Sequence, residues 1–230
     1  RGLGDVYKRQ ILYYGPSSSK DLLATINQYH QVPAALKDIP AGNEYSYLET
    51  PVTKVLVAPY DAKQIYMAQI SNLDKKYDPA IEPIRALYDE YFGGGMNSIV
   101  FQEMRETRGL AYSAWASIMP PSYLKYPYVL RTQIATQNDK MIDAVTTFND
   151  IINNMPESEA AFKLAKDGLT NRLRTERIIK GDIIWSYINA QDLGQNVDPR
   201  IKLYNDIQNM SLKDIVDFQK QWVKGRTYVY

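Results

Sequence analysis

The stretch FGGGMNSIVFQEMRETRGLAYSAWASI, residues 92–118, contains the features that decide the fold of this chain. Three consecutive glycines, Gly93 to Gly95, follow a run of helical spacing and allow a sharp turn between two closely packed helices. A short helix is predicted from Ser98 to Glu106, and Gly109 ends it. A strand that carries Tyr112 then begins. The stretch therefore predicts the order helix, glycine turn, helix and strand.

The sequence on either side of this stretch switches repeatedly between strand and helix periodicity. Strand patterns occur at Ile11–Tyr14, Val52–Ala58, Gln64–Ile70, Ala111–Ile118 and Tyr126–Ile134. Helical patterns occur at Ser19–Tyr29, Asp78–Tyr91, Met141–Met155, Phe162–Leu173, Ile183–Leu193 and Ser211–Trp222. The last two strand patterns are close in sequence and predict an antiparallel hairpin. The fold class is therefore predicted as α+β, with a mostly antiparallel sheet and helices packed on one of its faces.

The two ends of the chain differ from the rest. Residues 1–10 carry no periodic apolar pattern, and we expect them to be a non-native or disordered tail outside the fold. Residues 11–230 are expected to form one domain. Arg226–Tyr230 has the pattern of an interrupted strand, so we expect the domain to be truncated at its C-terminal end, as a fragment of a longer protein.

Composition and charge restrict the classes of function. The sequence contains 27 Lys and Arg and 26 Asp and Glu, so a net charge of +1 gives no field for binding nucleic acid. We see no run of about 20 apolar residues that would span a membrane. The absence of cysteine excludes disulfides and thiol nucleophiles. Nothing in the sequence locates the protein, and a bacterial periplasm or cytoplasm is compatible with it.

The sequence also gives little support for a metal site or a nucleotide-binding site. A catalytic zinc normally takes two or three histidines, and the only histidine is His30, at the end of a predicted helix. No metal or other cofactor is therefore expected in this chain. The glycine run Gly93–Gly95 is not followed by Lys-Ser or Lys-Thr and comes after a helix instead of a strand, so a phosphate-binding loop is disfavoured.

Arg105 and Tyr112 are the residues whose chemistry suits a reactive site. They lie seven residues apart, and a turn at Gly109 can bring them together. Both side chains are hydrogen-bond donors suited to a developing oxyanion. Physical reasoning alone favours ordinary roles, with Arg105 in a surface salt bridge and Tyr112 in the sheet.

A family resemblance favours a functional role for Arg105 and Tyr112 over these ordinary roles. The runs Gly-Gly-Gly-Met-Asn-Ser, Phe-Gln-Glu-Met-Arg-Glu and Arg-Gly-Leu-Ala-Tyr-Ser occupy residues 93–98, 101–106 and 108–113. They closely resemble the signature of the insulinase-like (pitrilysin, M16) zinc metallopeptidase superfamily. The similarity covers nearly all of Ile11–Tyr230, and the chain looks like the C-terminal, zinc-free half-domain, since it has no inverted His-x-x-Glu-His motif.

The resemblance implies a function for this half. Family members close two homologous halves around a peptide chamber; one half holds zinc, and the other offers an Arg and a Tyr to the substrate. The spacing matches Arg105 and Tyr112, which the resemblance implies as catalytic residues, whereas Arg108 and Gly109 are given structural roles. The implied partners are a zinc-bearing homologous half, on the same chain or a separate subunit, and a peptide substrate. The chain alone is expected to be inactive.

A second class of function is also compatible with the resemblance. The superfamily includes core subunits of respiratory complexes, so the chain can be a non-catalytic homologue that serves as an assembly or peptide-binding subunit. Retention of both Arg105 and Tyr112 favours catalysis over this alternative.

Overall fold

The computed structural model describes residues 11–30, 34–36, 38 and 46–230 of the chain, which separate into two compact units. One unit contains the described part of residues 1–46 together with Arg177–Asn189. The other contains Tyr47–Glu176 and Ala190–Tyr230. The predicted tail at residues 1–10 lies outside the described residues.

The smaller unit is helical in its described part. Helix α1 (Ser19–Tyr29) begins after Ser18, whose hydroxyl oxygen accepts from the backbone N–H of Asp21 at 3.1 Å. This helix matches the predicted bounds. The strand predicted at Ile11–Tyr14 is wrong, because these residues pair with no other described backbone. Helix α6 (Gly181–Asp192) belongs to this unit as far as Asn189.

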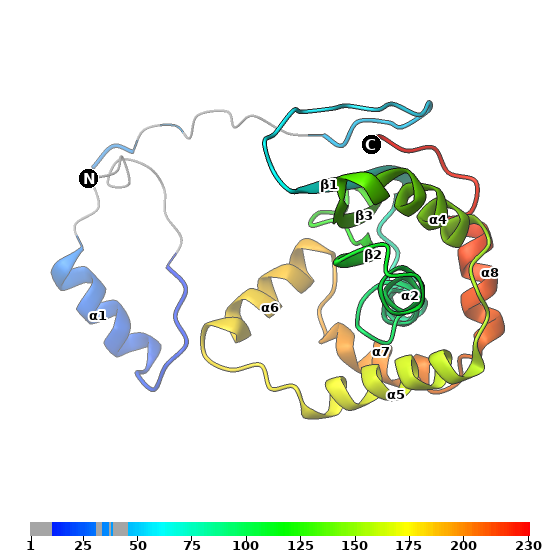
Figure 1. Cartoon of the computed structure of the whole chain (residues 1–230). Helices are drawn as coiled ribbons and strands as arrows, with labels where there is room; N and C mark the ends of the chain where they lie inside the picture. Colours follow the sequence, from blue (N-terminus) through cyan, green and yellow to red (C-terminus); the bar gives the residue numbers. More distant parts are fainter. Residues whose placement is uncertain (1–10, 31–33, 37, 39–45) are drawn as a thin grey trace. The chain divides into compact units, whose positions relative to one another are not determined.

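The larger unit is built on a three-stranded antiparallel sheet. Its strands are β1 (Gln64–Lys76), β2 (Ser113–Met119) and β3 (Pro127–Gln137), in the spatial order β1-β3-β2. Figure 1 shows helices packed against this sheet, so the predicted fold class and the predicted β2–β3 hairpin are confirmed.

The strand predicted at Val52–Ala58 is present only as a bridge. Lys54 pairs in parallel with Val229, and Val229 also pairs antiparallel with Ile70 of β1. The C-terminal segment Thr227–Tyr230 therefore lies between β1 and the Lys54 backbone. Val52–Ala58 does not form a longer ladder, because the C-terminal segment beside it is hydrogen-bonded to it only at Lys54 and Leu56.

The remaining helices of the larger unit cover most of the predicted helical patterns. They are α2 (Glu82–Phe92), α3 (Ile99–Phe101), the π-helix η2 (Gln102–Thr107), the 3-10 turn η3 (Asn138–Lys140), α4 (Met141–Asn153), α5 (Glu159–Thr175), α7 (Pro199–Ile207) and α8 (Leu212–Trp222). Helix α2 begins later than predicted, because Asp78 caps a separate turn by accepting from the N–H of Ala80 at 2.8 Å. Helix α7 was not predicted.

An aromatic cluster fills the core between the helices and the sheet. Phe218 of α8 lies 5.1 Å from both Tyr88 of α2 and Trp222, measured between ring centroids. Trp222 in turn meets the ring of Tyr128 of β3 edge-on at 5.3 Å. All four rings are at most 5% exposed. This burial accounts for part of the tyrosine-rich composition, since each ring contributes large apolar area.

Helix α2 is fixed to β2 by a network centred on Asp89. The Asp89 carboxylate accepts from Arg85 at 2.8 Å, from the hydroxyl of Ser117 at 2.9 Å and from the backbone N–H of Ile118 at 2.8 Å. Burial raises the pKa of Asp89 to about 6, although Arg85 and the other donors favour its ionised form.

One turn further along, Gly93 brings the same two elements together. A Cβ atom at Gly93 would lie 2.3 Å from the carbonyl oxygen of Ala116, so only glycine fits at this approach. These contacts hold the end of α2 against β2 and so fix both ends of the connection that contains the segment from Ser98 to Tyr112.

Candidate functional site

Arg105 lies near the end of a short helix that changes from α to π geometry. Ser98 caps the start: its hydroxyl oxygen accepts from the N–H of Phe101 at 3.4 Å and donates to the carbonyl of Gly95 at 2.6 Å. After α3 the backbone continues as the π-helix η2, which contains Arg105. Single π turns widen a helix locally and occur frequently at functional sites. Arg105 is in the last turn, where its cation also complements the helix dipole.

A turn at Gly109 redirects the chain from η2 into β2. Gly109 has φ +59°, in the left-handed region that glycine enters without strain. The carbonyl of Met104, a buried residue, accepts from the N–H of both Leu110 and Ala111, at 2.8 and 3.2 Å. The N–H of Tyr112 then donates to Ala135 of β3 at 2.8 Å. The backbone on both sides of the turn is therefore held by hydrogen bonds.

These two features place Arg105 and Tyr112 side by side. The Cζ atom of Arg105 lies 5.8 Å from the ring centroid of Tyr112 and 5.0 Å from that of Phe101. Both distances are within the range of cation–π attraction, about 6 Å. The guanidinium is thus oriented by two aromatic rings, one from its own helix and one from the start of the sheet.

Both donor groups remain accessible. The Arg105 side chain is 46% exposed and has one long ionic contact, 3.6 Å to Glu106. Tyr112 is 70% exposed, and its hydroxyl makes no hydrogen bond within the described part of the chain. The salt bridge expected on physical grounds is therefore weak, because such exposed pairs contribute about 0–1 kcal/mol. The arrangement can present two donors to one polar group outside the domain.

The other residues that the sequence analysis considered are engaged in contacts within their own unit of the fold. Arg108 makes an exposed contact of 3.4 Å with Glu103. His30 ends α1 in the smaller unit, where its backbone N–H donates to Ile26 at 2.7 Å. The glycine run permits close packing at Gly93, as described above. The N-terminal cap at Ser98 and the turn at Gly109 are local devices that orient η2.

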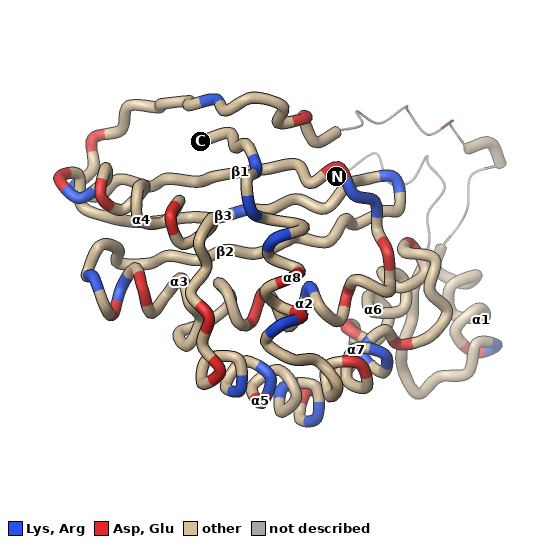
Figure 2. The backbone as a smooth tube through the Cα atoms, turned by 90° about the vertical axis from the view of Figure 1, so that its right-hand side faces the viewer, with Lys and Arg blue, Asp and Glu red and all other residues tan. Residues whose placement is uncertain are grey.

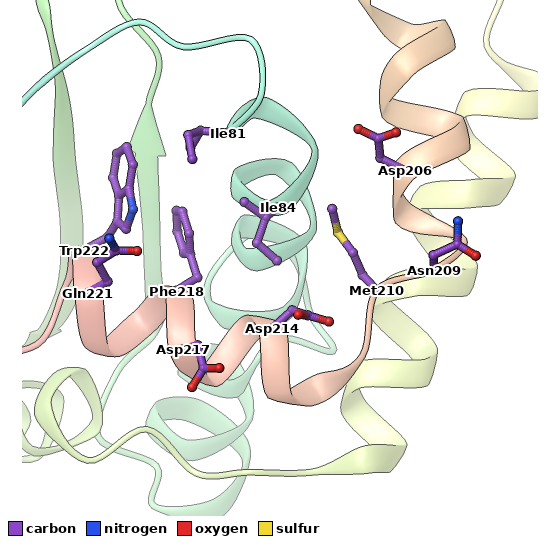
Figure 3. A pocket seen from close by; sticks show the side chains of 10 residues that line it. All are labelled: Ile81, Ile84, Asp206, Asn209, Met210, Asp214, Asp217, Phe218, Gln221 and Trp222. Atoms are coloured by element: carbon purple, nitrogen blue, oxygen red, sulfur yellow. The ribbon is translucent and has the colours of Figure 1, made fainter.

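A surface pocket lies away from this pair, between α2, α7 and α8. Figure 3 shows its apolar side chains, among them Ile84, Phe218 and Trp222, beside three aspartates, and its volume is about 380 Å³. The aspartates are already engaged: Asp206 with Lys202, Asp214 with the cap residue of α8, and Asp217 with Lys213. Within the described ranges no three His, Cys, Asp or Glu side chains gather into a possible metal site.

The surface charge of the larger unit is mixed. Figure 2 shows lysines and arginines interspersed with acidic residues along α5. No helix in the described part of the chain is long and apolar enough to cross a membrane.

Two contributions to this site were not predicted from the sequence. Phe101 is the second ring beside Arg105, and only its spacing four residues before Arg105 could have indicated this. Asp89 positions β2, but a single aspartate in an amphipathic pattern gives no signal that its carboxylate is held by a distant strand.

One of the comparisons with known proteins identifies a family. A family profile described as "Peptidase M16 inactive domain" matches residues 10–169. No curated protein matches the sequence.

Solved structures share the fold at low sequence identity. The peptidase M16 inactive domain from Pseudomonas fluorescens is 17% identical, with a TM-score of 0.66, over 93% of this chain and 50% of that one. A protease from Helicobacter pylori is 11% identical, with a TM-score of 0.67, over 93% and 52%. A chain of Complex III2 from Candida albicans is 14% identical, with a TM-score of 0.58, over 93% and 52%. The present chain thus spans about half the length of each of these three.

Proposed function

The chain belongs to the family of M16 peptidase inactive domains, and from this premise we propose that it forms one wall of a two-half zinc endopeptidase, with Arg105 and Tyr112 facing the peptide. The other half would hold the zinc, which supplies a Lewis acid and an activated water. The observation that carries the proposal is the convergence of two exposed donors, with the guanidinium 5.8 Å from the tyrosine ring.

The two side chains suit different parts of the reaction. Arg105 is permanently charged, so it can hold a carbonyl oxygen of the bound peptide before any bond changes. The hydroxyl of Tyr112 can donate one directed hydrogen bond. When a peptide carbonyl is attacked, negative charge builds on its oxygen, and a donor placed opposite the zinc stabilises that charge.

The test uses the intact two-half protein. Tyr112→Phe is expected to lower kcat by about 10²-fold while KM changes much less, because the lost donor acts mainly in the transition state. Arg105→Ala is expected to impair both constants, since it also removes ground-state binding.

Arg108→Ala provides the matched control. Arg108 is a neighbouring exposed arginine, with 48% of its side chain accessible and a single acidic contact. It should leave both constants nearly unchanged, and zinc content and folding should be equal in all three variants. Full activity of Tyr112→Phe on several peptides would show that Tyr112 is an ordinary sheet residue.

The second candidate function is a non-catalytic assembly or peptide-binding subunit. The likeness to a chain of Complex III2 favours it, because the same fold occurs outside proteases. Zinc analysis and peptide hydrolysis of the intact protein separate the two proposals. A protein that binds no zinc and cleaves no peptide, and in which Arg105→Ala changes nothing, would support the subunit.

A further inference from the structure

Two backbone carbonyls of the turn between η2 and β2 receive their hydrogen bonds from side chains elsewhere in the larger unit. The hydroxyl of Thr136, near the end of β3, donates to the carbonyl of Leu110 at 2.5 Å. The ammonium of Lys140, the last residue of η3, donates to the carbonyl of Gly109 at 3.1 Å. Within the described residues no backbone N–H donates to either carbonyl. Both acceptors therefore depend on these two side chains.

The N–H groups of the same turn are bound by η2. The N–H of Gly109 donates to the carbonyl of Arg105 at 3.1 Å. The N–H groups of Leu110 and Ala111 donate to Met104, as described above. The turn is thus attached through its N–H groups to the helix that contains Arg105, and through its carbonyls to β3 and η3. Loss of the carbonyl bonds would allow the turn to move with η2 relative to the sheet.

The same end of β3 also holds the backbone of Tyr112. Ala135, which accepts from the N–H of Tyr112 at 2.8 Å, directly precedes Thr136. Leu110, which accepts from Thr136, lies two residues before Tyr112. Tyr112 is 70% exposed, so packing around its ring contributes little to its position. Its own backbone bond and the bonds of the preceding turn therefore set where its hydroxyl lies.

Thr136 is placed as a buried donor. Only 2% of the residue is exposed, and the carbonyl of Leu110 is the partner of its hydroxyl. An acceptor that loses its donor away from water keeps the cost of its desolvation, so the turn would shift towards another donor if the hydroxyl were absent. Lys140 is less deeply buried, so water can replace part of its hydrogen bond, and its contribution is expected to be smaller.

We propose that Thr136 and Lys140 are positioning residues for the pair Arg105 and Tyr112: they fix the intervening turn and thereby the distance at which the two donors are presented to a peptide carbonyl. The catalytic consequence rests on the proposed function, whereas the attachment of the turn does not. Both residues act through Tyr112, so neither is assigned a contact with the peptide. Because misplacement by about 1 Å can lower turnover by about 10²-fold, a modest shift of the turn should be measurable in kcat.

Three substitutions in β3 isolate the hydroxyl of Thr136. Thr136→Val keeps the size and the β-branched shape of the side chain and removes only the donor. Thr136→Ser keeps the donor. Thr132→Val is the matched control, because Thr132 is also buried in β3 and its hydroxyl donates to Gln69 of β1, at 2.7 Å, instead of to the turn.

Lys140→Met, with a second matched control, tests the ammonium. Lys166 likewise donates to backbone carbonyls, those of Gln208 and Met210, at 2.7 and 2.9 Å. Lys166→Met therefore removes bonds of the same kind in a different part of the unit. Amide exchange is measured on the 230-residue chain, and kinetics on the intact two-half protein.

Thr136→Val should speed amide exchange at Tyr112 and Ala111 by about 10-fold relative to Thr132→Val. It should also lower kcat by about 10-fold while KM changes by less than about 3-fold. Thr136→Ser should stay within about 2-fold of the original chain in both measurements, because it keeps the donor. Lys140→Met should change exchange and kcat by about 3-fold, and Lys166→Met should change neither.

A double variant tests whether Thr136 acts through Tyr112. In the Tyr112→Phe background, Thr136→Val should lower kcat by less than about 2-fold, because the group that it positions has already been removed. An undiminished fall in kcat in this background would overturn the proposal, as would equal exchange at Tyr112 in Thr136→Val and Thr132→Val. Faster exchange at Tyr112 combined with full activity of Tyr112→Phe would refute the proposed function and support the attachment of the turn by Thr136.

Discussion

Replacement of Gly93 by alanine tests whether the glycine run is a packing device. The new Cβ would lie 2.3 Å from the carbonyl oxygen, 2.5 Å from the nitrogen and 2.8 Å from the Cα of Ala116. Ordinary contacts at a Cβ begin near 3.4 Å, so α2 and β2 would have to separate by about 1 Å. Because all three of these Ala116 atoms belong to the backbone, rotation of a side chain cannot relieve the clash.

The loss in free energy of unfolding depends on the contacts that this separation would disturb. Overpacking costs about 1–3 kcal/mol. The bonds from Ser117 and Ile118 to Asp89 lie within two residues of the clash, and weakening them adds about 1 kcal/mol. We expect a total loss of about 3 kcal/mol, which lowers Tm by roughly 6–12 °C in a domain of this size. Urea unfolding followed by circular dichroism measures the change.

Gly95→Ala provides the control from the same glycine run. A Cβ at Gly95 would meet only the Glu90 side chain, at 3.9 Å, so stability should change by less than about 0.5 kcal/mol. The reasoning is refuted if Gly93→Ala is as stable as the original chain, or if the two variants are equally destabilised.

Two further predictions concern the buried carboxylate and the N-terminal residues. Because the folded-state pKa of Asp89 is about 6, above its ordinary value of 3.8, the folded protein binds the extra proton between these two pH values. The original chain should therefore gain stability relative to Asp89→Asn as pH falls from 7 to 4, by up to about 3 kcal/mol in urea unfolding; a gap independent of pH would contradict the shifted pKa. Deletion of residues 1–10 should change Tm by less than about 2 °C in a thermal melt, whereas a loss of several degrees would show that these residues pack against the fold.

The fold class could be predicted because its signals are periodic. The alternation along Tyr126–Ile134 predicted β3, and the stripe along Met141–Met155 predicted α4. Helix α7 was missed because it presents a single buried residue, Ile207, so its apolar stripe is faint. The strand at Val52–Ala58 was overestimated, because alternation reports which side chains are apolar and does not show whether a neighbouring strand is present.

The site was predicted only in part. The proximity of Arg105 and Tyr112 could be anticipated from Gly109, since a glycine after a helical run commonly ends the helix with a turn. The π geometry of η2 could not be anticipated from the sequence. It is accompanied by hydrogen bonds to the carbonyl of Met104, which accepts from two residues beyond the turn. Hydrogen bonding of this kind is decided by the tertiary position of β2 and leaves no periodic trace in the sequence.

The geometry of the pair depends on packing that lies outside the pair itself. Tyr112 is held through its backbone bond to Ala135, and the guanidinium of Arg105 lies against the rings of both Phe101 and Tyr112. This contact between a ring and a cation does not use the hydroxyl of Tyr112 or the guanidinium N–H groups of Arg105 as hydrogen-bond donors. A surface salt bridge would consume the guanidinium donors, whereas an aromatic contact leaves them available in the plane of the group. This difference favours a binding role for Arg105 over the surface salt bridge that its sequence context alone suggests.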